Sequence, residues 1–519
     1  MGPKVIVLIL CMVFGVPVHA NVSLASPFSD HMVLQRGMAV PVWGTATNGE
    51  TVTVTFRGQT KTFVTGSDGK WLIRLDSTSE GGPFSLVAKG ANTITVSDVM
   101  VGEVWVGGGQ SNMEAVTSFF AGPNLDTVQT ANYPNLRLMS FAKTKQWQAC
   151  TPTVALNFSA TGFYFGRDLY KALNVPVGII INAIGGTDIE SWLDPASVSA
   201  DPLLAGDTSA GNLFRQWVVP LAPFALRGVI WYQGENNATF SYPTHPTRTA
   251  TYYGPRFKFL IPGWRSTWGQ GNFPFYFVQL ANDNAAQTAP GANSALATVR
   301  EAQRLGLSVT NTEMVVTIDI GDATNVHPKD KWDVGNRLLL PALAHLYGQP
   351  NLVYSGPLYK SMTIQGANVR LVFLYANELS AKGGQKLSGF EVAGSDNKWS
   401  FANAAILGDT VVVSASPVSS PTQVRYAWAD NPVCNLINGA GLPASPFQTS
   451  GSQLPVSIVS RAGHVAKGLL SAQANARMFD ALGRTFIQAR LSSGKIVFVS
   501  TKGIVHGVFN RQFSRSRDE

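Results

Sequence analysis

Cysteine and charge are both scarce in this 519-residue chain. It contains three cysteines, and charged residues make up 13% of the sequence. So few cysteines exclude a disulfide framework, and together with scattered histidines they give no zinc-ligand spacing. Cys11 lies in the N-terminal leader described next, and the sequence leaves open whether Cys150 and Cys434 pair.

Long apolar runs are also missing after the first twenty residues. Lys4 precedes the short apolar run 5–14, and residues 18–20 supply small side chains at cleavage-site positions. This pattern predicts a secretory signal peptide over 1–20, with Asn21 as the first mature residue. No later run approaches the ~18 residues that a membrane span needs. We expect a soluble, secreted protein, either extracellular, at the cell surface or periplasmic.

The excess of positive charge is confined to the C-terminal tail. The formal net charge is +8, and residues 455–519 hold ten Lys/Arg against three acidic residues, which leaves the rest at +1. A nearly neutral body argues against a nucleic-acid-binding core.

Four regions follow the leader. Residues 21–96 alternate polar and apolar side chains, as in 51–56 and 93–96, which predicts an N-terminal β-sandwich. Over 97–350, apolar runs alternate with helix-like stretches, which predicts a parallel sheet with helices on both faces. Residues 351–448 return to β patterning, and 449–519 form a linker and a basic β module. The apolar runs are 101–106, 177–181, 228–232, 274–278 and 314–319, and the helix-like stretches are 162–173, 213–224 and 331–346.

The stretch GGGQSNME, residues 107–114, follows the first strand of this α/β region. Glycines let the backbone turn sharply and approach other atoms closely, and the serine after them is exposed on the turn. In parallel sheets the ligand crevice lies outside the carboxyl ends of the strands. Ser111 is therefore either a nucleophile or an ordinary turn residue. No Gly-Lys-Ser/Thr follows the glycines, which excludes a phosphate loop.

Three later strand ends carry polar clusters as well. They are NAIGGTDIESW (182–192), WYQGENN (231–237) and DIGDATNVHP (319–328). Each has an ordinary alternative, because Glu235 is able to cap a helix and His327 to lie in a surface loop. On successive strand ends, however, they bring together the nucleophile, base, orienting group and oxyanion donors that acyl transfer needs.

The combination resembles the sialate O-acetylesterases and related carbohydrate acetylesterases of the SGNH hydrolase group. The resemblance runs from DHMVLQ at residue 30, through GEVWVGGGQSNM, GGTDIESW, GVIWYQGENN and HPKDKWDVGNRLLLPAL, to VRYAW and GLPASPF near residue 447. It implies an SGNH-type, flavodoxin-like α/β fold, flanked by the N-terminal β-sandwich and the C-terminal β-rich segments.

The resemblance also implies roles for particular residues. Ser111 would be the nucleophile and His327 the general base. Many SGNH hydrolases carry Asp three residues before the histidine, but this chain has Thr324 there. Glu235 of the QGE motif is our expected third triad member, with Asp322 as the alternative.

The oxyanion hole would combine the backbone N–H groups of Ser111 and Gly186 with a side-chain amide. Gln233 is our choice for the amide, and Asn236 and Asn237 are its rivals.

These roles predict a serine esterase that removes O-acetyl groups from a carbohydrate through an acetyl-serine intermediate, without metal or cofactor. A carbohydrate-binding protein that lost the activity is the alternative from another class. The sialate carboxylate should meet an arginine, for which Arg215, Arg265 and Arg300 are candidates. Acetyl-xylan is the alternative substrate.

The tail suggests a further partner. The stretch ARMFDALGRTF at 476–486 resembles part of the sorting domains of bacterial type IX secretion. The tail would contact the secretion machinery, or as a basic β module it would hold the enzyme to a cell surface.

Overall fold

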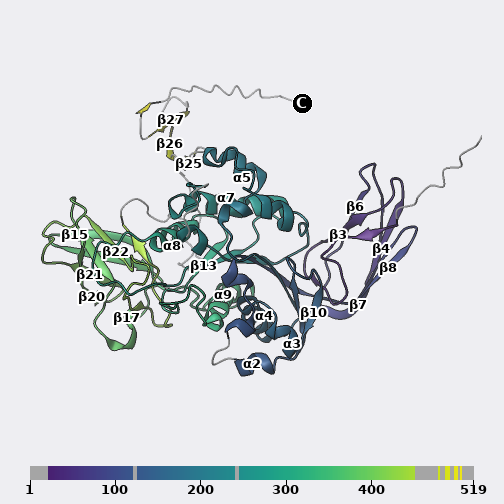
Figure 1. Cartoon of the computed structure of the whole chain (residues 1–519), viewed down its shortest axis with the longest axis horizontal. Helices are drawn as coiled ribbons and strands as arrows, with labels where there is room; N and C mark the ends of the chain where they lie inside the picture. Colours follow the sequence, from purple (N-terminus) through teal and green to yellow (C-terminus); the bar gives the residue numbers. More distant parts are fainter. Residues whose placement is uncertain are drawn as a thin grey trace, which may run out of the picture.

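A computed structural model describes residues 21–120, 125–239 and 245–449, together with the backbone of four short strands in the C-terminal tail. The α/β layers lie in the middle of the molecule, between N-terminal strands at one end and a C-terminal β region at the other (Figure 1). The predicted signal peptide, the linker and the D-x-x-G-R part of the tail lie outside the described residues.

Eight strands make up the N-terminal region. Three of them form one small sheet in the order β1-β3-β6, and β4, β5, β7 and β2 pair into a second sheet with β8. Their bounds are β1 Ser23–Leu24, β2 Val33–Gln35, β3 Val40–Thr45, β4 Thr51–Phe56, β5 Gln59–Val64, β6 Lys70–Leu75, β7 Gly81–Lys89 and β8 Thr93–Gly109.

Strand β8 belongs to two regions at once. Its first half pairs with β7, and its second half pairs with β11 and β12 of the α/β region. The predicted boundary between residues 96 and 97 therefore lies inside one strand, and the N-terminal region shares a continuous sheet with the rest of the chain.

A buried carboxylate strengthens this junction. Glu103 on β8 is fully buried, and it accepts hydrogen bonds from Arg36 Nε at 2.7 Å and from Arg227 Nε at 2.8 Å. Gln35 lies beside them and donates to Glu103 at 3.2 Å. Because a buried charge is costly unless it is paired, these contacts tie the DHMVLQ segment to the α/β region.

The central sheet has the strand order β10-β9-β11-β8-β12-β13-β14. All neighbours are parallel except the edge strand β10. Every residue of β11, β12 and β13 is buried, as expected for parallel strands covered on both faces. The bounds are β9 Tyr133–Ser140, β10 Trp147–Cys150, β11 Val177–Ala183, β12 Gly228–Tyr232, β13 Phe275–Gln279 and β14 Thr312–Val316.

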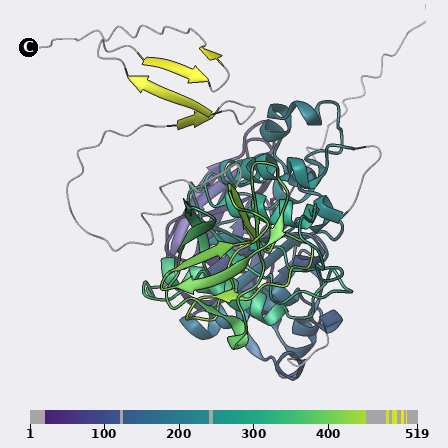
Figure 2. The same ribbon diagram turned by 90° about the vertical axis from the view of Figure 1, so that its left-hand side faces the viewer.

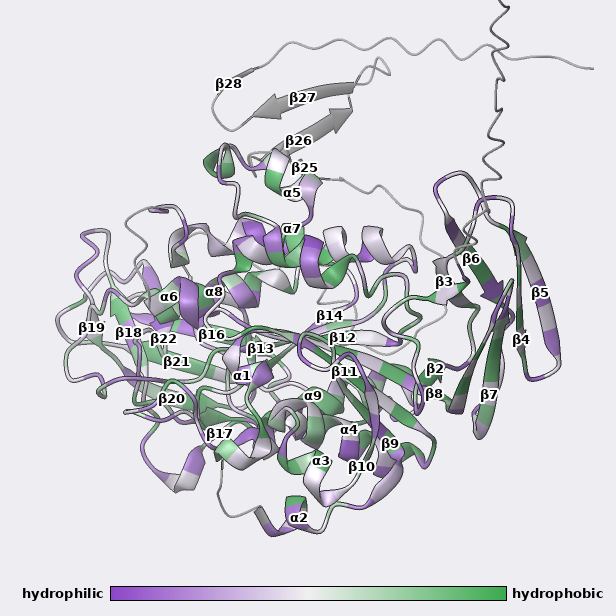
Figure 3. Ribbon diagram, turned by 45° about the vertical axis from the view of Figure 1, so that its right-hand side comes forward, coloured by the Kyte–Doolittle hydropathy of each residue, from purple (hydrophilic) through white to green (hydrophobic). Residues whose placement is uncertain are grey.

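Helices cover both faces of this sheet. Figure 3 shows α7 and α8 on one side of the apolar strands and α4 and α9 on the other. The α/β prediction is thus confirmed at the level of a mixed sheet with helices. The bounds are α1 Ser111–Glu114, α2 Leu125–Gln129, α3 Pro152–Leu156, α4 Ala160–Leu173, α5 Pro195–Ala200, α6 Glu235–Thr239, α7 Ala250–Trp268, α8 Ala295–Gly306 and α9 Lys331–Leu346.

One helix expectation is wrong in extent. Instead of a helix over 213–224, the chain forms a short π-helical turn over Phe214–Val218. Pro220 and Pro223 follow, and proline lacks the N–H that a continuing helix needs and pushes the residue before it away from helical geometry.

The C-terminal β region packs against the α/β layers (Figure 2). It contains two four-stranded sheets, in the orders β15-β16-β21-β20 and β19-β18-β22-β24, and the pair β17-β23. The bounds are β15 Leu358–Gln365, β16 Asn368–Leu374, β17 Ser380–Ala381, β18 Phe390–Ala393, β19 Ser400–Phe401, β20 Asn403–Leu407, β21 Thr410–Ser414, β22 Gln423–Tyr426, β23 Leu436–Ile437 and β24 Phe447–Gln448.

The tail contributes four antiparallel strands, β25 Arg477–Phe479, β26 Thr485–Arg490, β27 Ile496–Ser500 and β28 Gly503–Ile504. Within the described residues, no helix has the length and apolar character that crossing a membrane requires. Cys150 and Cys434 are unpaired thiols, and burial raises the pKa of each to about 12.

Candidate active site

Close packing explains the three glycines before Ser111. A Cβ atom on Gly109 would come within 2.1 Å of the Tyr232 carbonyl oxygen, and one on Gly108 within 2.9 Å of the Trp231 ring. Gly109 also has a φ of +131°, which other residues rarely adopt. The glycines therefore let β8 lie directly against β12, and α1 starts at Ser111 immediately beyond the strand end.

Ser111 and His327 meet at this edge of the sheet. Ser111 Oγ lies 2.8 Å from His327 Nε2, although 216 residues separate them in the sequence. His327 comes from the loop between β14 and α9, and its backbone N–H donates to Asn325 Oδ1 at 2.9 Å. A hydroxyl in contact with an imidazole is the arrangement that activates a serine for acyl transfer.

Burial and charge favour the neutral form of this imidazole. Burial lowers the pKa of His327, the nearby ammonium of Lys331 lowers it further, and the carboxylate of Asp283 opposes both. An imidazole that stays neutral is able to accept a proton from the serine, as a general base must.

Glu235 lies in the site without touching the imidazole. Its Oε1 accepts a hydrogen bond of 2.5 Å from Asn112 Nδ2, and the same nitrogen donates to the Val326 carbonyl at 3.0 Å. No hydrogen bond joins Glu235 to His327 in the described part of the chain. Glu235 therefore reaches the histidine loop through Asn112.

Asp322 points to its own loop. Its Oδ1 accepts hydrogen bonds of 2.9 Å from both the backbone N–H and the hydroxyl of Thr324. These bonds cap a tight turn ahead of His327. Neither carboxylate that the sequence suggested as the third triad member contacts the imidazole, so that assignment stays a prediction.

The Gly185-Gly186 turn lies beside the serine. A Cβ on Gly185 would lie 3.5 Å from the Ser111 Cβ, and the Gly185 N–H donates to Glu114 at 2.6 Å. Gly186 is exposed, with a φ of +69° and open space beside its Cα. The turn thus lies next to the nucleophile with the Gly185 N–H already bonded to Glu114, and the role of the Gly186 N–H in an oxyanion hole stays a prediction.

The side-chain amides of the third motif are mostly engaged within the protein. Gln233 is fully buried, and its Nε2 donates to Thr187 O at 3.1 Å and to Asn237 Oδ1 at 2.9 Å. Asn237 in turn donates to Glu190 at 2.9 Å. Gln233 would have to give up one of these bonds to serve an oxyanion. Asn236 is also buried and lies between Glu235 and Asn237 on α6.

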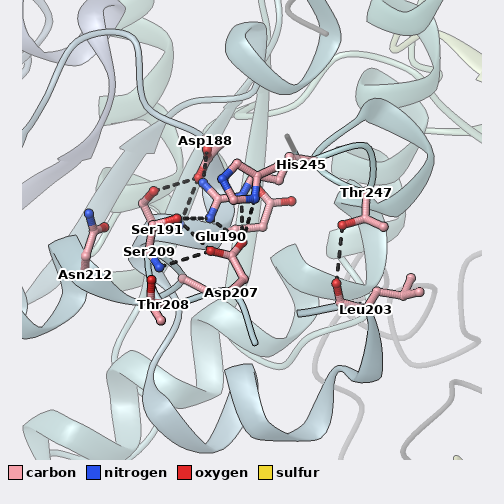
Figure 4. A network of polar contacts seen from close by, with 12 residues as sticks. Asp188, Glu190, Ser191, Leu203, Asp207, Thr208, Ser209, Asn212, His245 and Thr247 are labelled. Carbon is pink, nitrogen blue, oxygen red and sulfur yellow. Dashed lines mark hydrogen bonds and ion pairs between the residues drawn. The ribbon is translucent and has the colours of Figure 1, made fainter. Parts of the chain in front are cut away.

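A buried network of ion pairs holds the GGTDIESW loop in place (Figure 4). Asp188 pairs with Arg248 at 2.7 Å, and Arg248 also pairs with Asp207 at 2.5 Å. Glu190 pairs with Arg256 at 2.6 Å. Burial would raise the pKa of Asp207, but Ser209 and Arg248 hold it at about 2. Burial and the neighbouring Asp188 raise the pKa of Glu190, whereas Arg256 lowers it. The ion pairs and hydrogen bonds of the network hold the loop that carries Gly185 and Gly186.

Two of the arginines proposed for a sugar carboxylate have structural contacts instead. Arg265 donates to the backbone carbonyls of Phe273, Thr310 and Asn311. Arg300 is fully buried and donates to carbonyls of residues 280, 281, 429 and 430. Burial lowers the pKa of each to about 10. Arg215 is exposed and donates to the Ala210 carbonyl at 3.3 Å.

Four residues near the site were not predicted from the sequence to take part in it. Asn112 links Glu235 to the histidine loop, and Lys331 is a fully buried lysine whose Nζ contacts Pro328 O at 2.5 Å. Phe119 stands exposed beside His327, and Asp283 follows β13. Asn112 lies inside a quoted motif, but a one-dimensional pattern does not indicate which atoms its amide meets.

Comparisons with known proteins agree with this geometry. Residues 101–340 match the family described as carbohydrate esterase, sialic acid-specific acetylesterase. A sialate O-acetylesterase from Homo sapiens is 30% identical and one from Pongo abelii 29% identical, each over 82% of this chain and 91% of the relative. The crystal structure of a carbohydrate acetylesterase from Xanthomonas citri superposes with a TM-score of 0.75 at 37% identity, over 83% of this chain and all of the other.

The chain belongs to the sialate O-acetylesterase family.

This membership makes it a carboxylic ester hydrolase that acts as a carbohydrate O-acetylesterase. The matched residues 101–340 contain every strand end at which the sequence placed a catalytic group.

Proposed function

We propose that this acetylesterase is a serine hydrolase that forms an acetyl-enzyme on Ser111. The contact of 2.8 Å between Ser111 Oγ and His327 Nε2 carries the proposal. His327 removes the hydroxyl proton while Ser111 attacks the acetyl carbonyl. The oxyanion rests on the backbone amides of Ser111 and Gly186, and His327 then protonates the leaving sugar oxygen. In the second half, His327 removes a proton from water, the water oxygen attacks the acetyl carbonyl, and Ser111 Oγ leaves with the proton from His327, which releases acetate.

The intermediate is open to direct detection. Acid quenching during turnover of p-nitrophenyl acetate should trap an acetyl group on the tryptic peptide that contains Ser111, as measured by mass spectrometry. The His327→Ala variant should show little acetylation, because the serine then lacks its base. An acetyl group found on another residue, with Ser111 unmodified during turnover, would contradict the mechanism.

The proposed substrate is an O-acetylated sialic acid, which the names of the mammalian relatives support. Acetyl-xylan remains the second candidate, because Arg265 and Arg300 are saturated by backbone carbonyls and leave only Arg215 of the three arginines for a carboxylate. Acetate release from 9-O-acetylated sialic acid and from acetyl-xylan should be compared side by side. A clear preference for acetyl-xylan would replace the first substrate by the second.

Phe119 is suited to contact the sugar ring. Its side chain is 60% exposed, and its ring lies 6.0 Å from the His327 imidazole in an edge-on arrangement. An aromatic face beside the base provides an apolar surface for a sugar, and aromatic contacts contribute about 0.5–1.5 kcal/mol. We expect Phe119→Ala to raise KM for an acetylated saccharide by roughly two- to tenfold, with kcat for p-nitrophenyl acetate nearly unchanged.

Phe401→Ala is the matched control, since Phe401 is 49% exposed on β19 in the C-terminal β region. It should leave both substrates unaffected. Equal kinetics of the Phe119→Ala variant and the wild type on the saccharide would exclude the contact.

We also propose that the enzyme is secreted and that its basic tail serves export or attachment to a cell surface. The apolar leader and the tail's share of positive charge support this. Mass spectrometry of the exported protein should give Asn21 as its first residue.

A further inference from the structure

One segment by which the C-terminal β region reaches the active-site edge follows β22. Asn431 Oδ1 accepts a hydrogen bond of 2.8 Å from Asn282 Nδ2, and Asn431 Nδ2 donates to the Asn284 carbonyl at 2.7 Å. The Asn431 carbonyl accepts from Gln287 N at 2.9 Å. Asn431 therefore holds the first part of the loop that follows β13, and Glu391 of β18 holds the next part by accepting from Gln287 Nε2 at 2.6 Å and from Gly291 N at 2.9 Å.

That loop lies directly against the loop that carries His327. Asn282 Oδ1 accepts from the Gly321 N–H at 2.8 Å, and Asp283 forms a parallel bridge with Asp322. A Cβ on Gly321 would come within 1.9 Å of the Asn282 carbonyl oxygen. The position of Asp283 relative to the histidine loop is thus fixed by backbone contact.

Arg300 anchors the arrangement from inside the protein. Its guanidinium donates to the Ala429 carbonyl at 2.6 Å and to the Ala281 carbonyl at 2.6 Å. It is fully buried, and it joins the segment after β22 to the end of β13. Arg300 therefore links the two pieces of chain directly.

Asp283 brings to the His327 imidazole a negative charge that neither Glu235 nor Asp322 provides. Burial and Lys331 lower the pKa of His327, and Asp283 is the carboxylate of the described chain that raises it. Glu235 bonds to Asn112 and Asp322 bonds to Thr324. Asp283 Oδ1 accepts from the Asn284 N–H at 2.8 Å within its own loop, and that loop lies against the histidine loop through the Asp283–Asp322 bridge. When His327 takes the proton of Ser111 it becomes a cation, and a nearby negative charge stabilises that cation.

We propose that Asp283 is the carboxylate that stabilises the His327 imidazolium, and that Asn431 of the C-terminal β region is a positioning residue that holds Asp283 against the histidine loop. This inference rests on the proposed roles of Ser111 and His327. It makes the C-terminal β region a working part of the active site.

The test measures kcat/KM for p-nitrophenyl acetate against pH in the full-length enzyme. Asp283→Asn should lower kcat/KM about tenfold or more, because the imidazolium formed during the reaction loses the carboxylate that stabilises it. It should also move the acidic limb of the profile to lower pH, because Lys331 then acts on His327 unopposed. Asn431→Ala should produce both changes to a smaller extent.

Two matched controls separate this effect from general damage. Asp396→Asn removes an exposed carboxylate of the C-terminal β region that bonds to the N–H of Lys398, and Asn435→Ala removes an asparagine that bridges Lys386 and Ser388 within the same region. Both should keep the wild-type profile.

Three outcomes would overturn the inference. In the first, the pH profile of kcat/KM for Asp283→Asn is the same as that of the control Asp396→Asn. In the second, activity falls with an unmoved acidic limb, which a purely structural role would give. In the third, circular dichroism shows that Asn431→Ala is folded, and its pH profile of kcat/KM is the same as that of the control Asn435→Ala. Failure of the proposed mechanism itself is recognised separately, because Ser111→Ala would then retain activity.

Discussion

Replacing Ser111 with alanine is expected to reduce kcat for every acetyl ester by roughly 10³- to 10⁶-fold, the range found when a serine nucleophile is removed from its catalytic group. The reason is geometric, because Ser111 Oγ is the atom within 2.8 Å of His327 Nε2. Acetate release and p-nitrophenyl acetate turnover measure the loss. Folding should be unaffected, since the hydroxyl lies at the edge of the site.

Ser395→Ala, at an exposed position of the C-terminal β region, is the control and should retain full activity. His327→Ala should lose nearly as much as Ser111→Ala. The double variant should lose little more than either single variant, because the two groups act as one unit. Additive losses would mean that they act independently, and an active Ser111→Ala enzyme would refute the mechanism.

A second large effect is expected from the buried lysine behind the site. Lys331 is fully buried, with its ammonium 4.4 Å from the centre of the Phe120 ring. Burial lowers the pKa of Lys331 to about 7 from an ordinary value of 10.5, although the charge of Glu235 opposes the shift. In the unfolded chain the lysine returns to its ordinary pKa.

The sign of the pH dependence follows from these two values. Between about pH 7 and pH 10.5, the unfolded chain binds a proton at Lys331 that the folded protein has released. Lys331 therefore makes the free energy of unfolding rise with pH in this window, by up to about 1.4 kcal/mol per pH unit. Below pH 7 the lysine is protonated in both the folded and the unfolded state. Lys331 then no longer makes the free energy of unfolding depend on pH.

Lys331→Met should remove that slope and raise the unfolding free energy near neutral pH, because an apolar side chain of similar length replaces a buried charge. Urea unfolding between pH 6 and about pH 9 measures the effect. Lys329→Met, at an exposed position two residues away, should keep the wild-type slope. An unchanged slope in Lys331→Met would show that Lys331 is not the titrating group.

The sequence was sufficient for the α/β layers and for the pair at the centre of the site. Strands such as 177–181 and 228–232 are short, apolar and separated by amphipathic helices, and that periodicity reflects local burial. The carboxyl ends of parallel strands share one edge, so motifs after β8 and β14 had to converge. The convergence of Ser111 and His327 follows from this topology, and their predicted catalytic roles come from the resemblance to the family.

For the linker and most of the tail, only the amino-acid composition was informative. Their role in export stays a prediction. The N-terminal boundary shows a related limit. β8 is one strand through residues 96 and 97, and its burial changes from alternating to continuous at Val99 rather than at the predicted boundary.

What the sequence determined by itself is the class of chemistry: glycines that permit close strand packing, a serine at a strand end, a histidine at another, and family motifs between them. What only the tertiary structure decided is which polar atoms meet. Glu235 bonds to Asn112, Gln233 bonds to Thr187 and Asn237, and Asn431 holds the loop of Asp283 from 147–149 residues away. Hydrogen bonds act over about 3 Å, and a difference of one residue in loop geometry changes every partner, so their pairing is fixed by packing rather than by local pattern.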